Sequence, residues 1–542
     1  MPSLQQQPAA AATAPADPFS TPLGADLEPV LSEPSPLHLG QNSRPPSARQ
    51  QCMLRIFSKL SPEDLLAASQ VCRSWRQFAG LTWRHTKEAS VVAADATGSA
   101  GDGPLVVHRA RQLERLSLLV DTRLADEGLR LLAQQRPAAL RHLSIRARGA
   151  GRLEFTHGAL EHLVSHCPRL ETLLLEAGHL AVLSLRSDSL RSLRVLGAVR
   201  LQHLWLQAPQ LERLSLELGP RQPTPARDTF VTRFLANVSG PTAQATQVCT
   251  VLREVAEARA PLRHVHVSSP HLTDRAVEAL VSCDPSGWQS LCLNHSAQVT
   301  TDGVRQVAAR CRGLELLDLS GCTTVTDEAL GPLADGLGKS LLRLHLACCP
   351  LLSRTAIRKL VGGLPLLRVL DLGFSLVDRP RGSTAAEKNT AMDRMLGTGN
   401  MLVSPTLERS QPSRRCRSLL EELDPSAVGA SQTLELRSPS LECLSLWGCS
   451  RIRALRLECP RLEQLDLTNC RQLEAGGTEV ACPNLKSLQA AGAGAGVAHR
   501  VWECVESLQQ ELRQEAGGAA DAVHEPPRSR RRLDIDRAQP AA

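Results

Sequence analysis

The feature that most constrains this chain is a leucine spacing, Leu-x-x-Leu-x-Leu, that recurs from about residue 105 to residue 512. In the clearest copies a cysteine follows the third leucine by three positions, as in Leu314, Leu317, Leu319 and Cys322. Spacing of three and then two fits neither a 3.5-residue nor a 3.6-residue period over two turns, so the pattern excludes a coiled coil. It predicts a stack of about thirteen short strands, whose copies start at Leu113, Leu140, Leu170, Leu190, Leu211, Leu262, Trp288, Leu314, Leu341, Leu367, Leu441, Leu462 and Leu485.

This spacing matches the leucine-rich repeat, in which a short strand of each coil lines a horseshoe and the last apolar position is followed by Asn or Cys. The composition agrees, because the 542 residues include 91 leucines but no Tyr, seven Phe and six Trp. A set of ordinary globular cores would use more aromatic area, whereas thin coils each need only one layer of leucine. We therefore predict an α/β solenoid over residues 105–512.

Repeat length separates two kinds of coil. Between Leu262 and Leu367 the copies start at a long and nearly constant interval, and helix-like stretches follow Thr273-Asp274 and Thr326-Asp327. Each Thr is predicted to cap a helix and each Asp to favour its positive end, so these coils carry a strand inside and a helix outside. In a second kind of coil, leucines recur at less than half that interval, which leaves no room for a helix. We predict strands on both faces of these coils, at Leu183, Leu193, Leu204, Leu214, Leu434, Leu444, Leu455 and Leu465, with turns at Pro209, Pro439, Pro460 and Pro483.

Segments of different composition flank the repeats. Residues 1–50 are rich in Pro, Ala, Gln and Ser and are predicted to be a disordered leader, because they cannot bury enough apolar surface to offset ordering entropy. Residues 51–88 have a helical pattern, and the small residues of 89–104 predict a linker. Residues 513–542 are predicted to be a disordered basic tail, whose arginine run at 528–532 is either solvated or a nuclear import signal.

Two insertions are predicted within the solenoid, at about 219–260 and 378–431. The first contains a helix-like stretch from Val248 to Ala258, and the second is polar with Arg and Ser clusters. Loops of this length are usually functional or disordered.

Residues 51–88 contain a strong helix start at Ser61-Pro62-Glu63-Asp64, with Ser as N-cap, Pro at the first helical position and an acid three residues after the cap. Taken alone, this pattern predicts a small helical module that could seal the first coil.

The order and spacing of Leu54-x-Ile56-Phe57, Val71-Cys72-Arg73-x-Trp75 and Trp83-Arg84 resemble the F-box across most of this segment. In that family a three-helix F-box docks on the Skp adaptor, and through it on a cullin, of a ubiquitin ligase, and the repeats that follow hold the substrate. The Cys-containing repeats, such as Leu317-Asp318-Leu319-Ser320-Gly321-Cys322, resemble those of F-box/leucine-rich-repeat proteins. The resemblance implies an adaptor-binding set that consists of Leu54, Ile56, Phe57, Leu60, Pro62, Leu65, Leu66, Val71 and Trp75.

One part of the F-box pattern is missing. Family members usually open with Leu-Pro-x-Glu, whereas Ala48-Arg49-Gln50-Gln51 stands in those places here. This departure keeps open an alternative in which the chain is a repeat scaffold that binds a partner without assembling a ligase. A third hypothesis is a ligand-gated repeat receptor with the insertions over its pocket.

The variable positions of Leu-x-x-Leu-x-Leu are predicted to face the concave side of the horseshoe. They are basic in the early and middle coils and more acidic later, as at Asp371 and Asp466. Arginine clusters pair well with acidic or phosphorylated groups, so we predict a groove for such a substrate, against the alternative of a mixed solvated surface. The predicted substrate-binding residues are Arg141, His142, Arg194, Arg263, His264, His266, Arg343 and His345.

Other classes of function lack support in the sequence. No apolar run approaches the length that a membrane span requires, so a membrane partner is not expected, and no secretory signal precedes the repeats. A charge of +7 does not imply nucleic acid, and the 17 Cys lack C-x-x-C spacing, so neither a metal nor a cofactor is predicted. We therefore expect a non-catalytic substrate receptor of a Skp–cullin–F-box ligase, located in the cytoplasm or nucleus, that selects an unknown protein for ubiquitination and proteasomal degradation.

Overall fold

The computed structural model describes residues 48–93, 103–149, 151–219, 242–376 and 432–517. These residues fall into two compact units, one that ends at Lys59 and one that begins at Leu60. The first unit contains helix α1 (Ala48–Phe57). The second contains helices α2 (Pro62–Val71) and α3 (Arg73–His85), followed by the repeats. The boundary differs from the predicted 51–88 module, because α2 and α3 pack on each other and α2 contacts the first strand of the repeats.

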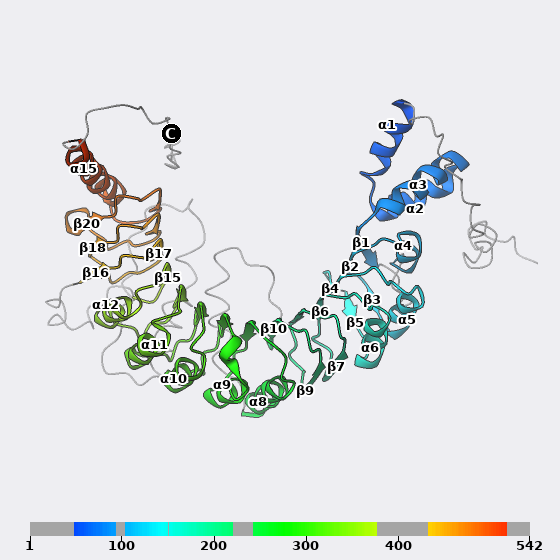
Figure 1. Cartoon of the computed structure of the whole chain (residues 1–542), viewed down its shortest axis with the longest axis horizontal. Coiled ribbons are helices and arrows are strands. Elements are labelled where there is room, and N and C mark those ends of the chain that lie inside the picture. Colours follow the sequence, from blue (N-terminus) through cyan, green and yellow to red (C-terminus); the bar gives the residue numbers. More distant parts are fainter. Residues whose placement is uncertain (1–47, 94–102, 150, 220–241, 377–431, 518–542) are drawn as a thin grey trace, which may run out of the picture. The chain divides into compact units, whose positions relative to one another are not determined.

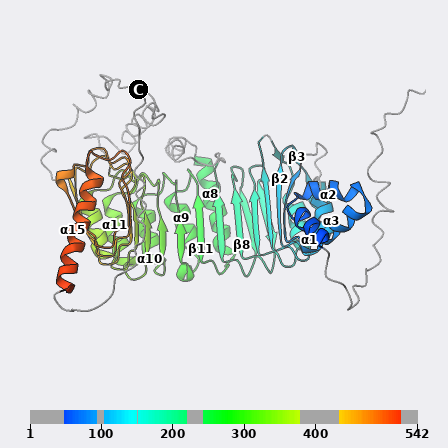
Figure 2. The same ribbon diagram turned by 90° about the horizontal axis from the view of Figure 1, so that it is seen from above.

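The repeats form a solenoid built on one parallel sheet, which has fourteen strands among the described residues (Figures 1 and 2). Thirteen of these strands follow the predicted repeat starts. In the order of the sheet the strands are β1 (Glu88–Ala93), β2 (Arg115–Val120), β4 (His142–Ala147), β6 (Thr172–Glu176), β8 (Ser192–Leu196), β10 (Arg213–Glu217), β11 (His264–Ser268), β12 (Ser290–Cys292), β13 (Leu316–Asp318), β14 (Arg343–His345), β15 (Val369–Asp371), β17 (Cys443–Ser445), β19 (Gln464–Asp466) and β21 (Ser487–Gln489).

Side chains alternate along each strand between the core and the solvent, as the two-residue period of a strand requires. In β13 the buried side chain is Leu317, which stands in register with Leu344 of β14, and Leu344 in turn with Leu370 of β15. All three leucines are fully buried. We call the solvent-facing side of the main sheet the concave face.

Helices cover the other side of the sheet in the longer coils (Figure 1). Each of these coils buries the apolar stripe of its helix, as at Ile357, Leu360 and Val361 of α12. The helices that follow α3 are α4 (Gly103–Arg109), α5 (Asp126–Gln134), α6 (His157–Ser165), α8 (Thr242–Glu257), α9 (Asp274–Leu280), α10 (Thr301–Arg310), α11 (Leu330–Leu337), α12 (Arg354–Gly363) and α15 (Val497–Gly517), with 3-10 turns η2 (Pro285–Gly287), η3 (Asp327–Ala329) and η5 (Ala475–Gly477).

The shorter coils carry strands on both faces, as predicted. Their outer strands form separate small sheets, in which Leu183 pairs with Leu204 and Leu434 pairs with Leu455. These sheets consist of β7 (Val182–Arg186) with β9 (His203–Gln207), and of β16 (Thr433–Arg437), β18 (Ala454–Glu458) and β20 (Thr478–Ala481); β3 (Arg123–Leu124) and β5 (Arg152–Leu153) form another pair.

The predicted linker at 89–104 is wrong at its start. Residues 88–93 form β1, which pairs along its whole length with β2. The Glu63 carboxylate of α2 accepts a hydrogen bond from the backbone N–H of Val92 at 3.2 Å. Helix α2 is therefore hydrogen-bonded to the first strand of the sheet, as expected of a module that covers the first coil.

The predicted capping by Thr273 and Thr326 is also wrong, since neither side chain caps its own helix. The aspartate that follows such a threonine instead reaches the next coil. The Asp274 carboxylate accepts hydrogen bonds from Thr300 N at 2.8 Å, from Thr300 Oγ1 at 2.6 Å and from Gly303 N at 3.1 Å. The first residue of α9 thereby accepts hydrogen bonds from two of the backbone N–H groups at the start of α10 that have no partner within the helix.

Within the predicted 219–260 insertion, residues 242–257 form α8, which packs on β9 and α9. Glu254 of this helix accepts hydrogen bonds from His203 Nδ1 at 2.7 Å and from Leu204 N at 2.6 Å. The solenoid also extends beyond the predicted end at 512, because α15 continues to Gly517. The second insertion, the leader before residue 48 and the tail after 517 lie outside the described residues.

Candidate functional site

The start of α2 is built as its sequence predicts. Ser61 Oγ accepts a hydrogen bond from Asp64 N at 3.1 Å and donates one to Asp64 Oδ2 at 2.8 Å, and Pro62 occupies the first turn. Helix α3 begins directly afterwards at Arg73, with the Cys72 thiol as its cap. Only Cys72 therefore separates the two helices. We call the segment from Val71 to Trp75 the α2–α3 corner.

Burial divides the nine predicted adaptor-binding residues into three groups, which are buried, half-buried and exposed. Phe57, Leu65 and Leu66 are at most 8% exposed, so their side chains already pack inside this chain. Their buried apolar area stabilises the module itself, and their contact with the adaptor stays a prediction. The half-buried members are Leu54, Leu60 and Pro62.

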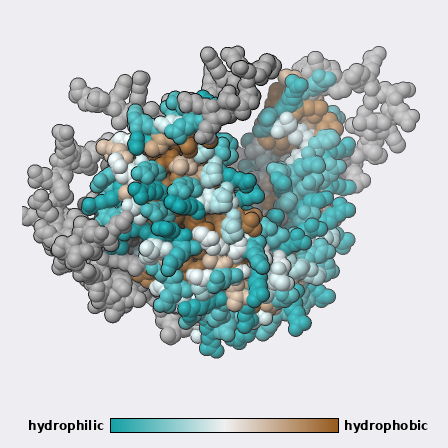
Figure 3. All heavy atoms as spheres, turned by 60° about the vertical axis from the view of Figure 1, so that its left-hand side comes forward, coloured by the Kyte–Doolittle hydropathy of each residue, from teal (hydrophilic) through white to brown (hydrophobic). Residues whose placement is uncertain are grey.

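The remaining three predicted residues offer apolar surface to solvent. Ile56 on α1 is 50% exposed, and at the α2–α3 corner Val71 is 63% and Trp75 is 40% exposed. Figure 3 shows that much of the surface in view is hydrophilic, with limited hydrophobic patches. An exposed valine and tryptophan at one corner are therefore candidates for contact with another protein.

The predicted substrate-binding residues lie on the concave face in two rows and along its rim. His142, His264 and Arg343 occupy the first outward position of their strands. Arg194, His266 and His345 occupy the second outward position of theirs. The two remaining residues, Arg141 and Arg263, lie one residue before a strand, at the rim.

Ion pairs between coils neutralise part of the predicted basic surface. Arg141 Nη1 lies 3.0 Å from Glu171 Oε1, and Arg194 Nη2 lies 3.2 Å from Glu217 Oε1. His345 Nδ1 lies 3.8 Å from Asp371 Oδ2, and the interaction with this carboxylate raises the pKa of His345. Stacking therefore places carboxylates beside several cations of the early and middle coils, and the predicted substrate groove stays a prediction.

A polar chain crosses the middle of the face. Ser215 Oγ lies 2.9 Å from His266 Nδ1, and His266 Nε2 lies 3.1 Å from Asn294 Oδ1. Asn294 Nδ2 donates to Asp318 Oδ2 at 3.3 Å, while Asp318 Oδ1 accepts from Ser320 N at 2.9 Å. The sequence suggested none of these contacts, because each joins residues of different coils or depends on the end of a strand.

Arg213 was not among the predicted substrate-binding residues. This residue is exposed and stands directly opposite His264 on the neighbouring strand. The available signal was its place in Leu211-x-x-Leu214, which is the same variable position that His264 occupies in its own repeat.

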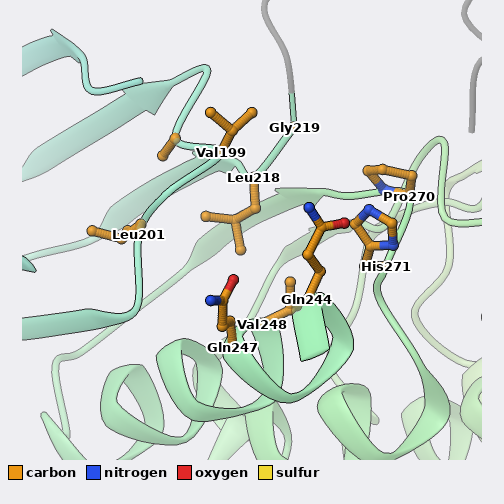
Figure 4. A pocket seen from close by; sticks show the side chains of 10 residues that line it. Val199, Leu201, Leu218, Gly219, Gln244, Gln247, Val248, Pro270 and His271 are labelled. Atoms are coloured by element: carbon orange, nitrogen blue, oxygen red, sulfur yellow. The ribbon is translucent and has the colours of Figure 1, made fainter. Parts of the chain in front are cut away.

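A small hollow lies between the end of β10 and helix α8 (Figure 4). Its volume is about 50 Å³, and its lining includes Leu218, Gln244, Pro270 and His271. His271 Nδ1 has no hydrogen-bond partner among the described residues, and burial lowers the pKa of this imidazole. Pockets for drug-sized ligands measure about 300–1,000 Å³, so this hollow gives no support to a ligand-gated receptor.

Within the described part of the chain, no group of three or more His, Cys, Asp and Glu side chains is arranged to hold a metal ion. None of the described helices is long and apolar enough to span a membrane. The described residues thus define a leucine-rich-repeat solenoid that begins with a pair of packed helices.

Comparison with known proteins makes the class more specific. The model of the F-box-like family matches residues 50–87, and a model of the leucine-rich repeats of an FBD-associated F-box protein matches residues 97–232. F-box/LRR-repeat protein 17 of Arabidopsis thaliana is 25% identical over 439 residues, which cover 81% of this chain and 65% of that protein. The chain therefore contains an F-box-like segment followed by leucine-rich repeats and is similar to an F-box/LRR-repeat protein, of which it spans less than two thirds of the length.

A solved structure is also similar in part. In the crystal structure of the Rad7 and Elc1 complex in yeast, one chain matches with 18% identity, 68% coverage of this chain and 94% coverage of that chain. The TM-score of this match is 0.30.

Proposed function

We propose that the chain is the substrate receptor of a Skp–cullin–F-box ubiquitin ligase. The observation that carries the proposal is the pair of exposed apolar side chains, Val71 and Trp75, within the segment that matches the F-box-like family. In this proposal the Skp adaptor covers this corner, and the concave face binds the protein to be ubiquitinated. The chain performs no covalent step itself and raises the effective concentration of its target near a ubiquitin-charged enzyme.

A pull-down with purified Skp adaptor and cullin tests adaptor docking. Val71→Asp and Trp75→Ala are expected to weaken capture of the full chain by about 2 kcal/mol or more, since exposed apolar anchors dominate such interfaces. Trp205→Ala is the matched control, because Trp205 of β9 is 53% exposed but lies in the repeats. Capture that neither substitution at the α2–α3 corner reduces would reject the proposal.

A scaffold that binds a partner without a ligase remains the second candidate. It is favoured by one observation, the replacement of the usual Leu-Pro-x-Glu by Ala48-Arg49-Gln50-Gln51. Under this alternative the wild-type chain captures no adaptor at all. The same pull-down therefore separates the two candidates.

A further inference from the structure

Strand β21 lies at one end of the main sheet and pairs with a single strand, β19. Its central side chain, Leu488, stands in register with Leu465 of β19. Leu465 is 2% exposed, whereas Leu488 is only half-buried, because no described strand lies on its other side. Strand β21 therefore presents one edge without a neighbour among the described strands.

Two comparable strand edges are covered by other elements. At the opposite end of the main sheet, α2 and α4 pack on β1, and Val92 N donates to the Glu63 carboxylate. At the end of the outer sheet, α15 packs on β20 (Figure 1), and Gln509 Nε2 donates to Pro483 O close by. No comparable packing joins a helix to β21 in the part of the chain that the structure describes. The edge of β21 is therefore open where the other two are closed.

Two rows of backbone N–H donors run from coil to coil and end at this edge. Leu467 N donates to Gln489 O at 2.6 Å, and Asn469 N donates to Ala491 O at 2.8 Å, as their counterparts in earlier coils do to the coil that follows. The N–H groups that continue the two rows belong to Ala490 and Gly492, and neither has an acceptor among the described residues.

A row of backbone acceptors ends at the same edge. Glu442 O accepts from Glu463 N and Gln464 N, and Glu463 O accepts from Lys486 N and Ser487 N. Lys486 O continues this row and has no donor within the described ranges. An extended chain laid along β21 would therefore meet donors and acceptors in the arrangement that each inner strand offers its neighbour.

The rim position, one residue before each strand, indicates the charge of such a chain. From the first coil onward this position holds residues of alternating sign, namely Lys87, Glu114, Arg141, Glu171, Arg191, Glu212 and Arg263. Ion pairs join several of these neighbours, as Lys87 Nζ lies 2.9 Å from Glu114 Oε1. At the last coil Lys486 Nζ lies 2.7 Å from Glu463 Oε1, and the Lys486 side chain is still 69% exposed. An acidic residue at the rim position of a further strand would continue the alternation.

We propose that the open edge of β21 binds an extended segment of another protein as a further strand, parallel to β21. The segment that fits carries an acidic residue at the rim position, followed two and four residues later by leucine or a similar side chain. The acid pairs with Lys486, the backbone completes the three rows of hydrogen bonds, and the first apolar side chain buries Leu488. The inference concerns a second partner and does not depend on adaptor docking.

Fluorescence anisotropy of a labelled peptide added to the full chain tests the proposal. The probe copies residues 462–469, LEQLDLTN, because this stretch of the preceding coil has the required pattern. It should bind saturably. A peptide with N-methyl groups at the positions of Gln464 and Asp466 lacks the N–H groups that would face β21 and should bind at least about tenfold more weakly. The matched control has N-methyl groups at the positions of Leu465 and Leu467, whose N–H groups would face away, and should bind like the probe.

Substitutions in the chain test the predicted charge pair. Lys486→Gln should weaken binding of the probe by about two- to fivefold, the range of an exposed ion pair. Lys87→Gln is the matched control, because it changes the rim lysine at the covered end of the sheet, and it should have no effect. A probe whose glutamate is replaced by glutamine should bind more weakly to the wild-type chain and should lose nothing further with Lys486→Gln.

Hydrogen exchange locates the bound peptide. The probe should slow exchange in residues 486–492 and leave residues 88–93 unchanged. Equal binding of the two N-methylated peptides, or protection elsewhere in the chain, would overturn the proposal. Absence of saturable binding would also overturn it and would show that the short strand and Lys486 keep the edge unpaired. Sedimentation without peptide should give a monomer, and a dimer that the probe dissociates would instead assign the edge to a second copy of this chain.

Discussion

The cysteines that follow the strands of the main sheet point their thiols at the backbone of the preceding coil. Cys349 Sγ donates to Leu319 O at 3.3 Å, and Cys470 Sγ donates to Leu446 O at 3.0 Å. Burial raises the pKa of Cys470 to about 12, so its thiol stays protonated and remains a donor. At the same position of another coil, Ser375 donates to Leu346 O through its hydroxyl. The position therefore requires a small side chain that carries a donor.

Substitutions at Cys470 test this requirement. Cys470→Ala should lower the free energy of unfolding by about 0.5–1.5 kcal/mol, because it removes one of two donors to the Leu446 carbonyl, which still accepts from Cys449 N at 3.1 Å. Cys470→Ser should cost less, since a hydroxyl can replace the thiol as it does at Ser375. Urea denaturation gives both values, and Cys443→Ala on the half-exposed concave face should change stability by no more than about 0.5 kcal/mol. Equal losses for Ser and Ala would show that packing alone matters at this position.

Between elements, the aspartates at the starts of the outer helices link successive coils. Asp274 serves α10 as described above, and Asp126 accepts from Thr156 N at 2.6 Å at the start of α6. Asp327 accepts from Ser353 N at 2.6 Å at the start of α12. These bonds fix the helix of one coil relative to the next, in addition to the leucine layers beneath them.

Removal of one link tests its contribution. Asp274→Ala deletes three hydrogen bonds to the start of α10 and should lower the free energy of unfolding by about 2–4 kcal/mol. The same substitution at the exposed Glu278, on the same helix, should have little effect. Hydrogen exchange should show the loss of protection first in residues 301–304. Equal urea midpoints for the two variants would mean that the links contribute nothing measurable.

The elements that the sequence predicted are those with a strong local period. The short leucine interval implied the outer strands at Leu183 and Leu434, and both are present. Strand β1 was not predicted, because its sequence, EASVVA, contains no leucine. The hydrogen bonds of Asp274 and the ion pair of Arg141 with Glu171 were not predicted either. They join residues of successive coils, which lie a full repeat apart in the sequence. Whether an arginine on the concave face is paired or available therefore depends on stacking, which local sequence patterns do not contain.

At the scale of the whole solenoid, stability is a sum of coils and of the interfaces between them. The described repeats end in α15, which buries Val497, Val501 and Val505 against the last coils. Gln509 Nε2 of this helix donates to Pro483 O at 2.6 Å. Helix α15 thereby covers apolar surface that a further coil would otherwise bury.

Val501→Asp tests how far along the solenoid the packing of α15 stabilises the coils. A charge at a fully buried position should detach α15 and destabilise the last coils, because an unpaired buried charge is costly. Hydrogen-exchange measurements should then show that the backbone amides of β19, β20 and β21 lose protection, whereas those of β2, β4 and β6 remain protected. Leu512→Asp, on the same helix but 45% exposed, is the matched control and should change neither region. A uniform loss from β2 to β21 would instead show that the solenoid unfolds as one cooperative unit, in which damage at the last coil also reaches the first coils.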